Sequence, residues 1–344
     1  MISKRIAKGL GVAALIIVAL FIPFLLSGNP YWLSVLTVVG INILLVSSLR
    51  TITLLNVISL GQVGFALIGA YGSALLVMKA GVPFWLALIL AGLMSAMAAL
   101  ILGYPFMKVK GIYFAILTLL TAETFRLSAY YWRGLTGGTF GLLGIPSPEP
   151  VTLPVIGAIA FNNMSNYYCL VVVVLAVCLG VLYLIEHSYI SFRWRAIRDA
   201  EELSQSVGIN VSWYKIVNFV VACFFAGISG ALFAHYQHAL SADYTSRFGS
   251  LTSIYLLVYL VVGGQKSFAG PLIGTIVLTL ISELARPLRQ YQPMIIGGIA
   301  ILVMLLMPGA LASLPSQIRS WFRSKETGKR LKLAKPVSRT KESL

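Results

Sequence analysis

Long, uninterrupted apolar stretches recur along the chain, and they limit its fold more than any other feature. We expect ten hydrophobic segments, at residues 9–26, 32–49, 59–78, 84–105, 112–130, 167–186, 215–236, 251–263, 269–286 and 293–311. All but one have at least 18 residues, enough for a helix to cross a hydrocarbon core of about 30 Å. Charged residues make up only 10% of the 344 residues, far below the roughly 25% of soluble domains. The sequence therefore predicts an all-α, polytopic helical membrane protein, in which 251–263 is a partial or broken span.

Positive charge is divided unevenly between the two sides that ten crossings create. With the N-terminus inside, twenty Lys and Arg residues fall on the inner side and six on the outer side. Inner loops of membrane proteins carry such an excess, so both termini are expected in the cytoplasm. We therefore expect the net charge of +16 to face anionic lipid headgroups and not to bind nucleic acid.

The segments define one transmembrane domain, residues 1–311, followed by a basic cytoplasmic tail, 312–344. Two polar stretches interrupt the domain. The stretch 131–166 is rich in Gly and Pro and is expected to be an external loop made of turns. The stretch 187–214 lies on the inner side.

Small residues recur at every fourth position on two of the segments. The first series is Ala66, Ala70 and Ala74, and the second is Ala222, Ala226, Gly230 and Ala234. Such series allow helix backbones to approach closely in lipid. We expect packing within the chain, with contact between subunits as the alternative.

Two acid–base pairs lie near the outer ends of predicted spans. Glu123 and Arg126 are three residues apart, as are Glu283 and Arg286, a spacing that places each pair on one helix face. Charges in membrane segments usually pair, line a cavity or lie near an interface. The pairs are expected either to compensate each other at the outer interface or to line the mouth of a substrate path.

Sequence patterns typical of enzymes are missing from the chain. It has no H-E-x-x-H zinc motif, no G-x-S-x-G nucleophile elbow and no nucleotide-binding phosphate loop. Its three cysteines fall inside apolar segments without paired spacing, where cysteine behaves as a small hydrophobe. We therefore expect no catalytic residues, no metal and no cofactor bound by this chain.

The most hydrophilic internal stretch is "RWRAIRDAEELSQSVGINVSWYK", residues 193–215. Asp199 is expected to cap a short helix by accepting hydrogen bonds from first-turn N–H groups. Glu201 and Glu202 would lie favourably at the positive end of that helix. A helix of two turns is marginal in water by itself, so it is expected to need neighbours.

Leu203 and Val207 are four residues apart and give this short helix a small apolar stripe. Gly208 follows as the expected C-terminal stop, because glycine readily adopts the left-handed conformation found there. The features suit either an ordinary structured loop or a site where a partner docks.

Five stretches, in order, resemble the branched-chain amino acid permease family of ABC importers, of the LivM type. They are "SLGQVGFALIGAYGSA" (59–74), "VKGIYFAILTL" (109–119), "LTGGTFGLLGIP" (135–146), "RDAEELSQSVGIN" (198–210) and "VGGQKSFAGPLIGT" (262–275). The fourth is similar to the cytoplasmic coupling loop that docks onto an ATPase. The resemblance covers about residues 40–310 and implies that the residues from Asp199 to Gly208 couple transport to ATP.

The resemblance also implies partners: a homologous permease subunit, two ATPase subunits that bind the ATP, and an extracytoplasmic solute-binding protein. It implies a bacterial inner-membrane location and import of branched-chain amino acids, urea, amides or other small solutes. External loops are the surface that a binding protein can reach, so Arg133 and Arg247 are expected to help receive it.

Two other functions compete with this interpretation. An ion- or proton-coupled secondary transporter would need carboxylates near the membrane midplane, and Glu123, Glu186 and Glu283 all lie near segment ends. An intramembrane enzyme would need a catalytic set of residues that the sequence does not contain.

Overall fold

The computed structural model describes residues 23, 29–109, 111–153, 157–159, 161, 163–243, 246–265 and 267–306. Apart from Pro23, the expected first segment, 9–26, lies outside the described residues, as does the tail 312–344. Nine of the ten expected segments are therefore open to comparison.

A helix is present at each of these nine segments. Six are long and apolar enough to cross a membrane: α2 (Pro30–Thr53), α3 (Gln62–Ala80), α4 (Phe84–Phe106), α5 (Ile112–Tyr131), α7 (Met164–Glu186) and α10 (Val211–Gln237). Three are shorter: α11 (Ser250–Gly263), α12 (Gly270–Leu284) and α13 (Gln292–Leu306). The prediction of a polytopic helical membrane protein is confirmed.

The two polar stretches contain short elements of their own. The stretch 131–166 holds α6 (Arg133–Thr136), the 3-10 helix η1 (Gly138–Phe140), β1 (Leu142–Leu143), β2 (Val151–Leu153) and β3 (Gly157–Ile159). The stretch 187–214 holds α8 (Tyr189–Asp199) and α9 (Glu201–Ser206). Two antiparallel strand pairs form, β2 with β3 and β1 with β4 (Ala239–Leu240); η2 (Arg286–Tyr291) links α12 to α13.

Helix α10 lies at the centre of the bundle and packs against α2, α3 and α4. The two series of small residues meet here: a Cβ added to Gly230 would lie 1.8 Å from Ala66 O, and one added to Gly69 would lie 2.2 Å from Gly227 O. Because these backbones touch, the predicted packing within the chain is confirmed.

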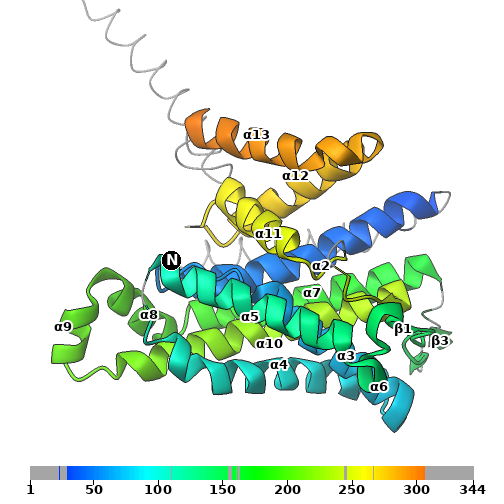
Figure 1. Cartoon of the computed structure of the whole chain (residues 1–344), viewed down its shortest axis with the longest axis horizontal. Coiled ribbons are helices and arrows are strands. Elements are labelled where there is room, and N and C mark those ends of the chain that lie inside the picture. The colour runs from blue at the N-terminus through cyan, green and yellow to red at the C-terminus, as the bar shows by residue number, and fades with distance from the viewer. Residues whose placement is uncertain are drawn as a thin grey trace, which may run out of the picture.

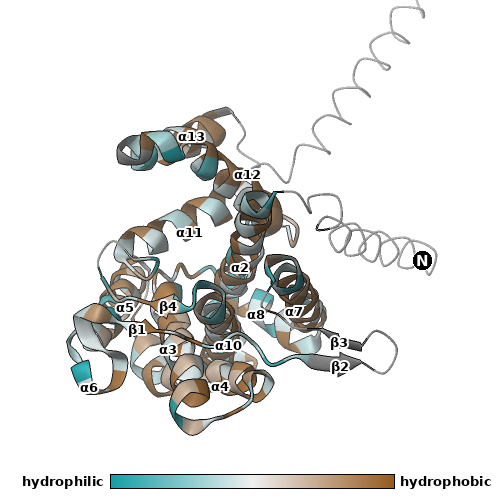
Figure 2. Ribbon diagram, turned by 90° about the vertical axis from the view of Figure 1, so that its right-hand side faces the viewer, coloured by the Kyte–Doolittle hydropathy of each residue, from teal (hydrophilic) through white to brown (hydrophobic). Residues whose placement is uncertain are grey.

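The short elements gather at opposite ends of the bundle. Helices α8 and α9 lie at one end, whereas α6, β1 and β3 lie at the other (Figure 1). Hydrophobic residues cover most of the long helices, and hydrophilic residues appear on short elements such as α6 (Figure 2). We refer to these two ends of the bundle as the α9 end and the α6 end.

Helices α11 and α12 form a tight hairpin beside α2. A Cβ on Gly274 would lie 2.2 Å from Tyr259 O, and one on Gly270 would lie 1.9 Å from Gly264 O. Helix α11 starts inside the bundle, where Ser250 Oγ donates a hydrogen bond of 2.8 Å to Glu123 in α5. The expected partial span, 251–263, is therefore a short helix of 14 residues.

Candidate functional site

The hydrophilic stretch at the α9 end is two helices, which corrects the single capped helix expected from the sequence. Asp199 is the last residue of α8 and not a cap: the residue before α9 is Ala200, and no side chain caps that helix. The Asp199 carboxylate instead accepts a 2.9 Å bond from Arg198 Nε. Helix α8 already occupies the residues before position 200, so the chain turns one residue later than predicted.

The rest of α9 is as expected. Glu201 and Glu202 lie in its first turn, where their charges oppose the positive helix end. Gly208 has a φ of 83°, and Ile209 N donates to Ser204 O at 3.0 Å. The left-handed glycine closes the helix as predicted.

Two apolar side chains of this segment are exposed. Leu203 is 66% exposed and Val207 is 73% exposed. Leu203 lies in α9 and Val207 directly follows it, and this helix leaves the bundle at its end (Figure 1). An apolar pair on such a projection is a surface that a partner protein can cover.

Helix α8 anchors this projection to the bundle. Trp194 and Ile197 are buried against Leu54 and Val211, and Trp194 Nε1 donates to Tyr214 O at 3.0 Å. Helix α8 was missed from the sequence, although the spacing of Trp194 and Ile197 on one helix face is a signal that could have predicted it. The apolar face of α8 thus holds the segment in place while α9 projects.

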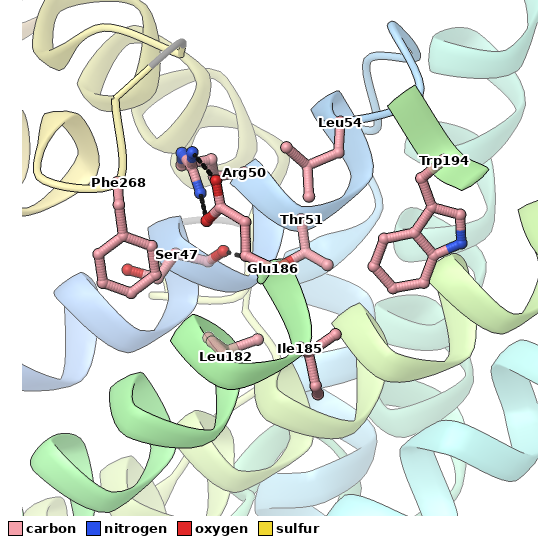
Figure 3. Close-up of a pocket in the computed structure, with 9 residues that line it drawn as sticks. All are labelled: Ser47, Arg50, Thr51, Leu54, Leu182, Ile185, Glu186, Trp194 and Phe268. Carbon is pink, nitrogen blue, oxygen red and sulfur yellow. Dashed lines mark hydrogen bonds and ion pairs between the residues drawn. The ribbon is translucent and has the colours of Figure 1, made fainter. Parts of the chain in front are cut away.

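A buried ion pair lies directly beneath this anchor. Arg50 Nη1 and Nη2 donate to the two carboxylate oxygens of Glu186 at 2.6 and 2.8 Å, and the two side chains are 5% and 10% exposed. Arg195 of α8 adds a longer contact to Glu186, at 3.4 Å. Figure 3 shows the pair in a small pocket lined by Ser47, Arg50, Thr51, Leu54, Leu182, Ile185, Glu186, Trp194 and Phe268.

This pocket connects elements that are distant in sequence. Arg50 lies in the last turn of α2, Glu186 is the last residue of α7 and closely precedes α8, and Phe268 is in the turn of the α11–α12 hairpin. The Arg50 guanidinium lies 5.5 Å from the centre of the Phe268 ring. Sequence reasoning missed the pair because its members are 136 residues apart.

The first predicted acid–base pair forms within α5. Arg126 Nε donates to Glu123 Oε1 at 2.9 Å, and Nη1 donates to Ala242 O at 2.7 Å. Arg126 is 6% exposed, whereas the Glu123 side chain is 26% exposed and also accepts from Ser250. The pair therefore joins α5 to the chain around residues 242–250.

The second predicted pair lies at the α6 end, at the periphery of the bundle. Arg286 Nη1 lies 3.0 Å from Glu283 Oε1, and Tyr31 donates a 2.5 Å hydrogen bond to the same oxygen. Arg286 is largely exposed, at 66% of its side chain. This geometry fits two compensating charges near an interface.

The two arginines expected to receive a binding protein are placed differently. Arg133 is exposed at the start of α6, as expected. Arg247 points inward: it donates to Asn42 Oδ1 in α2 and stacks on Phe233, with 4.5 Å between the guanidinium carbon and the ring centre. Because its charged group faces the interior, Arg247 is not the exposed rim residue that the sequence suggested.

The remaining candidate chemistry is sparse. Cys169, Cys178 and Cys223 are free thiols. Among the described residues, no group of three or more His, Cys, Asp or Glu side chains is arranged to hold a metal. The candidate site thus consists of an exposed apolar pair and the buried ion pair beneath its anchor.

Comparison with known proteins identifies the family. A family model described as branched-chain amino acid transport system, permease component, matches residues 31–308. The high-affinity branched-chain amino acid transport system permease proteins LivM of Salmonella typhimurium and Escherichia coli are each 29% identical over 326 residues, covering 90% of this chain and 76% of the relative. No solved structure is significantly similar to this chain. The chain therefore belongs to the family of permease components of branched-chain amino acid transport systems.

Proposed function

We propose that this chain is the membrane-spanning subunit of an ABC importer for branched-chain amino acids, and that α8 and α9 couple it to an ATPase. The observation that carries the coupling assignment is the projecting α9, which exposes Leu203 and Val207 while α8 is anchored in the bundle. A partner that binds this surface can move α8, and with it the end of α7.

The proposal includes partners and orientation. ATP is bound by two separate ATPase subunits at the α9 end, which is the cytoplasmic side, and a homologous permease completes the path. The inner excess of Lys and Arg supports this orientation. The location that follows is the inner membrane of a bacterium, and the chain itself carries out no catalysis and binds no cofactor.

The glutamates near the ends of the spans support import driven by ATP over ion-coupled transport. Glu123, Glu186 and Glu283 each form an ion pair with an arginine. A proton-coupled carrier needs a carboxylate near the membrane midplane that gains and loses a proton during the cycle, whereas these three serve as ion-pair partners.

Replacing residues 199–207 with a Gly/Ser linker of equal length tests the coupling assignment. The permease itself should still fold and insert into the membrane, because α8 up to residue 198 and its buried face remain. Uptake of L-leucine driven by ATP should be lost, and the ATPase subunits should no longer co-purify. Normal uptake by this variant would show that coupling occurs elsewhere.

We also propose that the α6 end receives the solute-binding protein, with Arg133 as a contact. The support is its exposed position next to the glycine-rich turns. Arg133→Glu should weaken docking of the binding protein more at low salt than at high salt, because exposed ion pairs are screened. Docking that is unchanged at both salt concentrations would remove Arg133 from the interface.

A further inference from the structure

Arg247 differs from the buried Lys and Arg side chains of the described residues. These are three, and each is paired with a glutamate: Arg50 with Glu186, Arg126 with Glu123 and Lys215 with Glu201. No carboxylate of the described residues forms an ion pair with Arg247. Its contacts are the amide oxygen of Asn42 and the face of Phe233.

The Arg247 guanidinium lies near the middle of the bundle. Helices α2 and α10 run antiparallel: the Ser34 and Tyr236 hydroxyls meet at 2.5 Å near one end, and Asn218 Nδ2 donates to Thr51 O at 2.9 Å near the other. Asn42, which Arg247 contacts, lies about halfway between these two points on α2. A charged group at such a depth is costly unless it has a partner, and it usually marks a functional site.

A narrow cavity adjoins this guanidinium. Its apolar walls come from α2, α3, α10 and the residue after Arg247: Ile41, Leu45, Val63, Phe233 and Phe248. Helix α11, whose positive N-terminal end favours an anion, begins at Ser250, three residues after Arg247. One cation and aliphatic or aromatic walls complement a small solute with one carboxylate and an apolar side chain.

The backbone contact between α3 and α10 borders the same cavity. Ala66 and Gly230 line it, and a Cβ added to Gly230 would lie only 1.8 Å from Ala66 O. A solute therefore enters only when the surrounding helices separate, as an alternating-access cycle requires. The cavity is then the closed state of a substrate site on the translocation path.

We propose that Arg247 binds the carboxylate of the transported amino acid within the membrane, and that these apolar walls receive its side chain. Asn42 holds the guanidinium in position between transport cycles. This inference rests on the proposed function, because it identifies where an imported amino acid would be recognised after the binding protein releases it.

The test uses the complete importer in proteoliposomes, with ATP inside and liganded binding protein outside. Arg247→Met should lower L-leucine uptake by about tenfold or more, the loss expected when a charge-assisted hydrogen bond to the substrate is removed. Hydrolysis of ATP stimulated by the binding protein should continue, because the docking surfaces are unchanged. Arg247→Lys should keep most of the uptake, since it retains the cation.

Asn42→Ala separates substrate binding from a purely structural role. If Arg247 only braces the chain against α2, removing Asn42 should reduce uptake as much as Arg247→Met does. If Arg247 binds substrate, Asn42→Ala should keep uptake within about threefold of the wild type, as expected for loss of a single weaker hydrogen bond. Equal losses in the two variants, or normal uptake by Arg247→Met, would overturn the proposal.

A binding measurement tests the carboxylate directly. Labelled L-leucine should bind the importer without its binding protein, and unlabelled L-leucine should displace it whereas L-leucinamide, which lacks the carboxylate, should not. Arg247→Met should abolish this displaceable binding. Equal displacement by both compounds contradicts a carboxylate site. A wild-type importer that moves no L-leucine with ATP would instead refute the proposed function, and this control is measured first.

Discussion

Lys215 Nζ lies 2.8 Å from Glu201 Oε2, so the beginning of the membrane-spanning helix α10 is tied to the first turn of α9. The lysine side chain is 11% exposed and the glutamate side chain 31% exposed. This contact joins the projecting segment to the helix at the centre of the bundle. It gives a movement of α9 a direct route into the membrane domain.

Breaking this ion pair should uncouple ATP hydrolysis from transport. In Lys215→Met, we expect fewer molecules of L-leucine imported per ATP hydrolysed, because α9 can move without moving α10. Arg198→Ala is the matched control, since it removes an exposed pair within the same segment, Arg198 with Asp199. The ratio of uptake to hydrolysis in proteoliposomes measures the effect. Equal ratios in wild type and Lys215→Met would contradict it.

Gly208 should tolerate asparagine but not valine. Its φ of 83° lies in the left-handed region, which costs other residues about 1–2 kcal/mol and a β-branched residue more. A Cβ at this position meets nothing within 4 Å, so the penalty comes from the backbone alone. Gly208→Val should lower ATP-driven uptake while membrane insertion is retained, and Gly208→Asn should transport normally. Similar losses in both variants would point to a contact instead.

The Arg50–Glu186 pair should show strong non-additivity in stability. Removing one partner leaves a buried charge unpaired, which costs about 3–5 kcal/mol. We expect Arg50→Met or Glu186→Leu alone to lower the melting temperature of the purified permease more than the double variant does. Additive losses would mean that the two side chains act independently.

Neutralising Glu123 and Arg126 together should be milder for transport than losing Arg126 alone. Arg126→Met leaves Glu123 with Ser250 but without its cation, whereas Glu123→Gln with Arg126→Met leaves no charge. Uptake of L-leucine by the wild type and these two variants shows which change is milder. Loss of transport in the double variant, with ATPase docking intact, would assign the pair a direct role in translocation.

Gly230→Ala should destabilise the bundle, whereas Gly180→Ala should not. A Cβ at position 230 would lie 1.8 Å from Ala66 O, but one at position 180, on α7, meets nothing within 4 Å. Over-packing of this kind typically costs about 1–3 kcal/mol. Melting temperatures of the two purified variants give the comparison, and equal values would show that α3 and α10 can separate without cost.

Features that depend on neighbouring residues could be predicted from the sequence. Apolar length predicted a helix at each of the nine comparable segments, six of them long enough to cross a membrane, because hydrocarbon thickness sets the length of a spanning helix. The spacing of Glu123 and Arg126, or of Glu283 and Arg286, was enough to predict each pair. Gly208 was identified as a helix stop because few other residues adopt its conformation.

Features that depend on the folded chain could not be predicted in the same way. Arg50 and Glu186 meet only because α2 and α7 pack together, and neither sequence environment specifies the other. Arg247 lies in a polar stretch between spans, which suggested an exposed loop. The stretch instead turns into the bundle, where β4 pairs with β1 and α11 begins.

The short length of α11 has a consequence for how the protein is made. Its 14 residues extend about 21 Å at 1.5 Å per residue, which is less than the thickness of the hydrocarbon core. A helix end that stops inside this core needs partners for its backbone groups within the protein. We therefore expect the hairpin of α11 and α12 to settle only after α2 and α5 are in place, because these helices pack against it.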